Sequence, residues 1–144
     1  MKLSTKSTYG LRAMLNLALE YGKGAISISA IAEKEDISVS YLEQLLNKLR
    51  RSGLVKSLRG PHGGYVLAKR PGAITVGDII RVLEGDTAPV YCVTARKGAA
   101  RLCKRSGLCA AKGVWEKLAR AIDDVLDSAN LQGLAKEAIR GGKT

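Results

Sequence analysis

Three features of this 144-residue sequence predict a mainly α-helical fold with a small β-hairpin. Apolar side chains recur at helical spacing in several segments, and these segments are bounded by Ser, Thr or Gly. Two of the segments lie close together and are separated only by a short turn. Two short apolar runs with a glycine-rich stretch between them follow directly. Together these features predict a winged helix-turn-helix, to which a long dimerisation helix is appended near the C-terminus.

The first two helices are expected to begin at serines. Ser4 or Ser7 can cap a first helix that ends at Gly22, and Ser29 can cap a short second helix. The side chains of the first helix that are expected to face the core are Leu11, Met14, Leu15, Ala18 and Leu19.

The third helix carries the strongest local signals. Ser40 and Glu43 form a Ser-x-x-Glu capping box, and Gly53 marks the expected end of the helix. A well-capped helix that follows another across a short turn is the recognition helix of a helix-turn-helix. One face of this helix is expected to be buried through Leu42, Leu45, Leu46 and Leu49.

A hairpin and a fourth helix are expected next. Residues 54–58 and 65–68 have strand patterns, and the glycine-rich tip at 59–64 joins them into the wing. The sequence Thr75-Val76-Gly77-Asp78 is a second expected capping box, at the start of a fourth helix that is expected to end at Gly85.

The last part of the chain has a narrow apolar seam. Its positions are spaced as in paired helices, which favours a homodimer helix, because a helix-turn-helix protein must span two half-sites. The alternative is an amphipathic helix packed on its own domain. A final helix is expected over residues 131–139. The seam comprises Trp115, Leu118, Ile122 and Val125, followed by Ala129.

The charge balance favours a polyanionic partner. Lys and Arg number 24 against 13 Asp and Glu, which gives a formal net charge of +11. Aromatic residues make up 4% of the chain and Phe is absent, which argues against a stacking surface for single strands and favours duplex DNA. The excess lies in two zones: residues 1–60 carry 10 basic and 5 acidic side chains, and residues 92–112 carry 6 basic and none acidic. An adaptor that binds proteins through these basic surfaces is an alternative.

No segment reaches the length of a membrane span. The apolar stretch 11–21 contains Arg12 and Glu20, and no cleavage pattern follows it, so a signal peptide is not expected. We therefore expect a cytoplasmic protein with no membrane partner.

DNA contacts are expected from the recognition helix and the wing. On the helix, Gln44 can pair with adenine and Glu43 can accept a hydrogen bond from cytosine, although Glu43 can equally serve only as a capping residue. Arg59 and the neighbouring glycines suit insertion into a minor groove, whereas a plain hairpin turn is the alternative. Phosphate contacts are expected from Lys2, Lys6, Lys48, Arg50, Arg51 and Lys56. The expected interface comprises Ser40, Tyr41, Glu43, Gln44, Lys48, Arg59, Gly60, His62 and Gly63.

Three cysteines, Cys92, Cys103 and Cys109, lie within 18 positions of one another in the basic zone. Neighbouring cations stabilise thiolates, which are the form that binds metal or becomes oxidised. Zinc is not favoured because C-x2-C pairs are absent and the single histidine lies in the wing, whereas an iron–sulfur cluster tolerates a fourth ligand other than Cys. A regulatory disulfide without a cluster is the main alternative. An enzyme with a cysteine nucleophile is not expected, because no base is available near the thiols.

The chain is therefore expected to have three parts. Residues 1–85 form the winged-helix DNA-binding domain, residues 86–112 form a cysteine segment that binds the cluster, and residues 113–144 form the dimerisation helix and the C-terminal helix.

Three motifs occur in order before the three cysteines and the Trp-bearing helix: Ser40-Tyr41-Leu42-Glu43-Gln44-Leu45, Arg59-Gly60-Pro61-His62-Gly63-Gly64-Tyr65 and Thr75-Val76-Gly77-Asp78-Ile79-Ile80. In this combination the sequence resembles the IscR and NsrR type of bacterial winged-helix regulators. The resemblance covers nearly the whole chain. It implies a homodimeric transcription factor, expected to be a repressor, with a 2Fe-2S cluster in preference to 4Fe-4S on the three cysteines. The signal would be iron–sulfur status, redox state or nitric oxide. By the same resemblance, Ser40, Glu43, Gln44 and Arg59 match positions that contact operator bases.

Two departures from that family pattern concern the cluster. Lys112 stands where some members carry a histidine ligand, and residues 1–19 contain no carboxylate that a partner chain could supply. The fourth ligand is therefore unassigned. The gap between Cys92 and Cys103 is also longer than the usual first spacing, and relatives without cysteines show that the fold alone does not imply a cluster.

Overall fold

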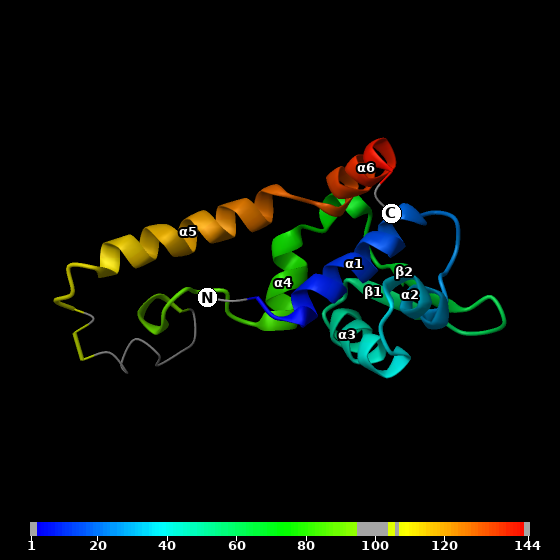
Figure 1. Ribbon diagram of the computed structural model, residues 1–144, viewed down its shortest axis with the longest axis horizontal. Coiled ribbons are helices and arrows are strands. Elements are labelled where there is room, and N and C mark those ends of the chain that lie inside the picture. Colours follow the sequence, from blue (N-terminus) through cyan, green and yellow to red (C-terminus); the bar gives the residue numbers. More distant parts are fainter. Residues whose placement is uncertain (1–2, 95–103, 106, 143–144) are drawn as a thin grey trace.

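The computed structural model describes residues 3–94, 104–105 and 107–142, and these residues confirm the predicted mainly α-helical winged helix-turn-helix (Figure 1). The wing is the only sheet formed by the described residues. The elements in chain order are α1 (Thr5–Leu19), α2 (Ile28–Glu35), α3 (Val39–Arg51), β1 (Val55–Leu58), β2 (Gly64–Leu67), the short helix η1 (Pro71–Ala73), α4 (Val76–Glu84), the short helix η2 (Tyr91–Val93), α5 (Lys112–Ser128) and α6 (Leu131–Gly141).

Helix α1 lies at the centre of the fold and contacts α2, α3, α4, α6 and β2. Ser4 caps it by accepting a hydrogen bond from the backbone N–H of Lys6, as one of the two expected caps. The predicted core face is confirmed for Met14 and Ala18, and the half-buried Leu11 packs against the core, whereas Leu15 and Leu19 are half-buried and lie outside that cluster. Because other elements pack on several sides of α1, the buried surface is wider than one helical stripe. The buried residues of the helix are Ser7, Gly10, Ala13, Met14, Asn16, Leu17 and Ala18.

The helix-turn-helix forms as predicted, but both of its caps lie two residues earlier than expected. Ser27 and Ser38 cap α2 and α3, so the predictions of Ser29 and Ser40 as caps were wrong. The backbone conformation just before each cap is fixed by another contact or turn. Ile26, before Ser27, pairs with β2, and Asp36, two residues before Ser38, takes the left-handed conformation with φ 53°. The leucine face of α3 is confirmed, since Leu42, Leu45, Leu46 and Leu49 are all at most 2% exposed.

The wing is an antiparallel hairpin whose register pairs Val55 with Leu67 and Leu58 with Gly64. Ile26, which precedes α2, adds an isolated bridge to Tyr65 through two backbone hydrogen bonds of 2.8 and 3.0 Å. Gly64 has φ 150°, and a Cβ there would overlap the Ile26 carbonyl. Only glycine therefore allows the wing to dock on the chain that leads into the helix-turn-helix.

The predicted capping box of α4 is confirmed. Thr75 Oγ1 accepts from the Asp78 N–H at 2.9 Å, and an Asp78 carboxylate oxygen accepts from the Thr75 N–H at 3.0 Å. Gly85 ends the helix, also as predicted. A backbone bridge between Thr75 and Asn130 brings α6 back against the body of the fold, where Leu131 is fully buried.

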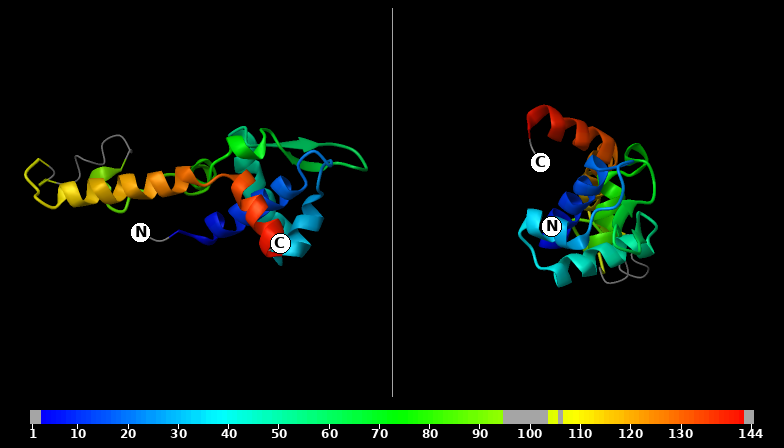
Figure 2. Two further views of the ribbon diagram at one scale, coloured as in Figure 1. Left: turned by 90° about the horizontal axis from the view of Figure 1, so that it is seen from above. Right: turned by 90° about the vertical axis from the view of Figure 1, so that its right-hand side faces the viewer.

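Helix α5 extends away from the rest of the molecule, at the end opposite the wing (Figures 1 and 2). It lies over α4 and η2 but buries none of its own residues. Among the described residues, no helix combines the length and apolarity needed to cross a membrane.

Candidate nucleic-acid interface

The first turns of α3 expose the polar side chains that were expected to meet DNA. Ser40, Glu43 and Gln44 are exposed, and Lys48 is exposed one turn further along. Because Ser38 caps the helix, the Ser40–Glu43 capping box does not form, and the Glu43 carboxylate is not used as a cap. Its orientation toward solvent therefore favours an external hydrogen-bond partner.

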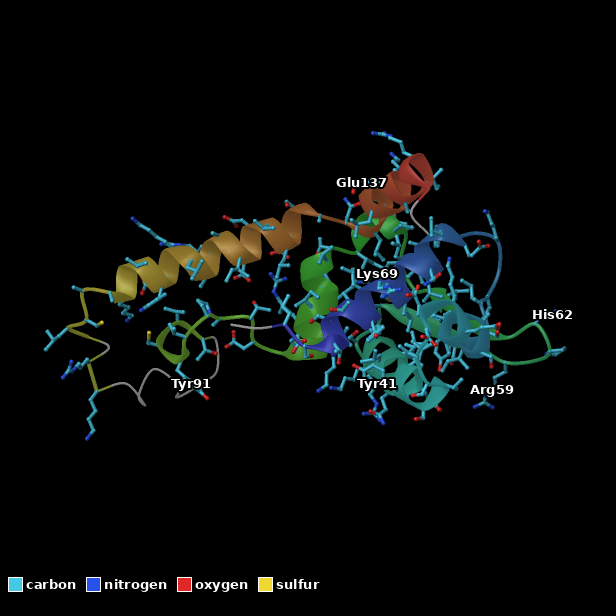
Figure 3. All side chains as sticks on the ribbon, viewed as in Figure 1. Tyr41, Arg59, His62, Lys69, Tyr91 and Glu137 are labelled. Atoms are coloured by element: carbon cyan, nitrogen blue, oxygen red, sulfur yellow. The ribbon has the colours of Figure 1, made fainter. Side chains whose placement is uncertain are left out.

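The wing tip is a tight turn in which the Gly63 N–H donates to the Gly60 carbonyl at 2.9 Å. His62 lies at the outermost point of this loop, and Arg59 projects from its base (Figure 3). Both side chains are exposed. The turn therefore presents a cation and an imidazole on a narrow strip of backbone, which is the shape that a minor groove admits.

Exposed cations surround the helix and the wing. Lys6 lies in the first turn of α1, the last turns of α3 carry Lys48, Arg50 and Arg51, and Lys56 lies on β1. Basic groups at the C-terminus of α3 also interact favourably with the helix dipole, so they stabilise the helix in addition to any contact with phosphate. Lys2, also expected to contact phosphate, lies outside the described residues.

The cysteine segment emerges from the end of α4 and returns to the start of α5. Cys92 lies in η2 and is half-buried, and Cys109 is exposed; both thiols are free. Cys103 lies outside the described residues. A hollow of about 390 Å³ is lined by Cys92, Lys112 and Glu116, among others. Within the described part of the chain, no three His, Cys, Asp or Glu side chains are placed to hold a metal ion.

An ion pair joins α5 to α4. Arg81 donates to both carboxylate oxygens of Asp127 at 2.8 and 2.9 Å and to Asp123 at 3.2 Å. The hydrogen bonds with Asp127 raise the pKa of Arg81 above its ordinary value, and the same contact lowers the pKa of Asp127. This bidentate contact joins the C-terminal half of α5 to α4.

The predicted dimerisation seam lies on α5 with much of its apolar surface in solvent. Trp115 is 36% exposed, Leu118 37% and Val125 68%, whereas Ile122 is half-buried. Ala129 lies just beyond the end of the helix, where the backbone becomes extended. The apolar strip therefore lacks a full cover within the described chain.

Sequence reasoning missed a polar contact at the start of α1. One Glu84 oxygen accepts hydrogen bonds from the Ser4 N–H at 2.8 Å, the Ser4 hydroxyl at 2.5 Å and the Ser7 hydroxyl at 2.6 Å. These hydroxyls lower the pKa of Glu84. The spacing of three between the serines puts them on one helix face, but nothing local indicates their partner.

A second missed feature ties α1 to α2. The Glu35 side chain is 6% exposed, and its carboxylate pairs with Arg12 Nε at 2.6 Å. Asn16 Nδ2 donates to the same carboxylate at 2.7 Å. One carboxylate oxygen accepts a hydrogen bond from Asn16, whereas the other has only the ion pair with Arg12, so the opposite charge of Arg12 compensates for its burial.

Comparison with known proteins identifies the fold and its class. The model of the Rrf2 family, described as iron-dependent transcriptional regulators, matches residues 3–137. The chain belongs to the Rrf2 family. The Bacillus subtilis regulator CymR is 46% identical over 135 residues, which cover 94% of this chain and 90% of CymR. The solved structure of that protein, described as a global cysteine regulator, has a TM-score of 0.77 at 44% identity and covers 95% of this chain and 98% of its own.

Two further solved Rrf2 regulators have the same fold. T. potens IscR has 44% identity and a TM-score of 0.76, with 96% of this chain and 88% of that chain covered. An oxidized form of Staphylococcus aureus CymR has 41% identity and a TM-score of 0.75, with 94% and 96% covered. The family resemblance expected from the sequence motifs is thus confirmed. The Rrf2 chain is a transcriptional regulator and not an enzyme.

The lowered pKa of Glu84 predicts an acid-sensitive contact in this Rrf2 regulator. A carboxylate whose pKa in the fold lies below its ordinary value of 4.5 stabilises the fold at neutral pH, and the contribution is lost as the pH falls through the folded pKa. The difference in unfolding free energy between wild type and Glu84→Gln should therefore shrink from pH 7 to pH 3, as measured by urea unfolding. Glu137→Gln, at an exposed position on α6, is the control for the exchange of a carboxylate for an amide. A difference that stays constant with pH would contradict the assignment.

Proposed function

We propose that this Rrf2 regulator is a homodimeric repressor that binds duplex DNA through α3 and the wing, and whose operator affinity depends on an iron–sulfur cluster. The supporting observation is the placement of exposed polar and basic side chains on the first turns of α3 and at the wing tip. In this proposal residues 1–85 bind DNA, residues 86–112 hold the cluster and residues 113–144 contain the dimer helix. The protein would act in the cytoplasm, where its operator lies.

Base recognition is assigned to the start of α3. Ser40, Glu43 and Gln44 would meet base edges in the major groove, since the N-terminal turns of a recognition helix reach deepest. Tyr41 and Lys48 complete the same surface, with Lys48 directed to phosphate. At the wing, Arg59 and His62 would enter the minor groove, and Gly60 and Gly63 allow the backbone to approach closely.

The homodimer is assigned to α5. Trp115, Leu118 and Val125 form an exposed strip, and Ile122 continues it at the same helical spacing. A second copy that covers this strip would remove apolar surface from water and pair two recognition helices about one helical turn of DNA apart.

The cluster is assigned to Cys92, Cys103 and Cys109, as 2Fe-2S in preference to 4Fe-4S. The donor set fits such a group, because the half-buried Cys92 and the exposed Cys109 are free thiols in a segment rich in cations. The cations favour the thiolate form that binds iron. When bound, the cluster would supply one-electron redox chemistry. The contribution of the chain would be to hold the three thiolates in the segment between α4 and α5.

A thiol switch without a cluster is the second candidate. The exposure of Cys109 makes it accessible to an oxidant, and the similar S. aureus CymR has been solved in an oxidized form. In this alternative a disulfide between two of the three cysteines would change DNA affinity.

Variants on the DNA face should separate base recognition from phosphate contact. Lys48→Ala should weaken binding to every duplex alike and reduce the slope of log K against log salt by about one, because one phosphate contact is lost. Gln44→Ala should weaken binding roughly 5- to 150-fold only on a duplex selected by the wild type from a random pool. Fluorescence anisotropy with selected and scrambled duplexes measures both effects. Lys136→Ala on α6 is the matched control, and an equal loss for this variant would contradict the proposed face.

Anaerobic purification tests the cofactor. We expect a coloured protein with about two iron and two acid-labile sulfide per chain, and loss of both in Cys103→Ser and Cys109→Ser. Visible absorption and chemical analysis of one sample decide this. A colourless protein that cannot be reconstituted, and whose DNA binding is lost with peroxide and restored by a reductant, would favour the thiol switch.

A charge in the α5 seam should dissociate the dimer. Leu118→Glu is expected to raise the dimer dissociation constant roughly thirty-fold or more, which corresponds to about 2 kcal/mol, because a carboxylate would be desolvated in an apolar contact. Sedimentation equilibrium measures the constant. Lys117→Glu introduces the same group on the neighbouring face and should leave it nearly unchanged, so equal effects of the two variants would argue against this seam.

A further inference from the structure

Two adjacent residues at the start of α1 make hydrogen bonds to different parts of the fold. Ser4 bonds to Glu84 of α4 through both its N–H and its hydroxyl. The hydroxyl of Thr5 shares a 3.1 Å hydrogen bond with the hydroxyl of Tyr41 in the first turn of α3. The first turn of α1 is therefore a direct link between α4 and the recognition helix.

The α4 side of this link lies where the cysteine segment begins. Glu84 is the last residue of α4, and Gly85 ends the helix. One Glu84 oxygen accepts from three donors within 2.8 Å, and one of them, the Ser7 hydroxyl, belongs to a residue that is only 3% exposed. Displacement of the end of α4 must therefore break these bonds or shift the start of α1.

The α3 side of the link is reinforced by aromatic contact. The ring of Tyr9, one turn after Thr5, meets the ring of Tyr41 edge-on, with centroids 6.2 Å apart and an angle of 89°. The Arg12 guanidinium lies 5.7 Å from the Tyr9 centroid and pairs with the buried Glu35 of α2. One face of α1 thus holds both helices of the helix-turn-helix, and Tyr41 lies two residues before Glu43.

We infer that Glu84 is a positioning residue for DNA recognition, which acts through Ser4, Ser7 and Thr5 on Tyr41 to set the orientation of α3. This inference rests on the proposed DNA-binding function and adds a route from the root of the cysteine segment to the recognition helix. Base-edge hydrogen bonds need side chains held within about 0.5 Å and 10–20° of their productive geometry, whereas phosphate contacts tolerate more movement. A loosened link therefore reduces selectivity between sequences more than it reduces affinity for DNA in general.

Hydrogen exchange tests the link without DNA. In the full-length chain, Glu84→Ala should raise amide exchange several-fold over residues 41–43, the first hydrogen-bonded amides of α3, and leave α6 unchanged. Thr5→Val should act on the same amides, and the double variant should exceed neither single variant by much, because both interrupt one path. Thr8→Val, an exposed position of the same helix with the same chemical change, is the control. Glu84→Gln keeps an acceptor for the Ser4 and Ser7 donors and should raise exchange at these amides less than Glu84→Ala does, while the unchanged α6 amides exclude a general loss of folding.

Selectivity provides the functional measurement. On the wild-type-selected duplex, Glu84→Ala should weaken binding roughly three- to ten-fold, with affinity for a scrambled duplex unchanged. Exchange at the start of α3 that matches wild type in Glu84→Ala, or effects of Glu84→Ala and Thr5→Val that simply add, would overturn the link. If the wild type itself fails to distinguish the two duplexes, the DNA-recognition proposal fails, while the exchange data still decide whether Glu84 positions α3.

Discussion

The packing of α1 against elements on several of its sides is the constraint on which the rest of the structure depends. Ala13 and Met14 are fully buried, and Gly10 brings the helix so close to α4 that a Cβ there would overlap Leu83. Small side chains at such close approaches leave room for neighbours around the helix. The same helix can therefore carry two polar faces with different partners, one formed by Ser4 and Ser7 and another by the row that begins at Thr5.

Helix α5 is held in a different way, because it buries no residue within the described chain. The Arg81 ion pairs attach its C-terminal half, but the groups involved are more than one-third exposed, so they orient the helix more than they stabilise it. Its N-terminal half carries the exposed Trp115 and adjoins Cys109. The position of that end therefore depends on what covers the apolar strip.

Sequence patterns predicted the elements that depend on local chemistry. The leucine face of α3, the capping box at Thr75 and the hairpin all follow from spacing alone. Serine caps were less well predicted, because Ser27 and Ser29 are chemically equivalent and the choice is made by the distant pairing of Ile26 with Tyr65. The exposed positions of the candidate site follow from the helix face. The contact between Ser4 and Glu84 joins residues 80 positions apart, and no local pattern encodes it.

In the proposed function, either chemistry at the cysteines would act on DNA binding through the two ends of the cysteine segment. At one end, Glu84 leads through the start of α1 to α3, so a change there alters how one recognition helix meets its base edges. At the other end, Lys112 begins α5, so a change there would alter the distance between two recognition helices in the proposed dimer. The first route changes preference among half-site sequences, because it acts within one subunit. The second changes preference among half-site spacings, because only the relation between subunits moves.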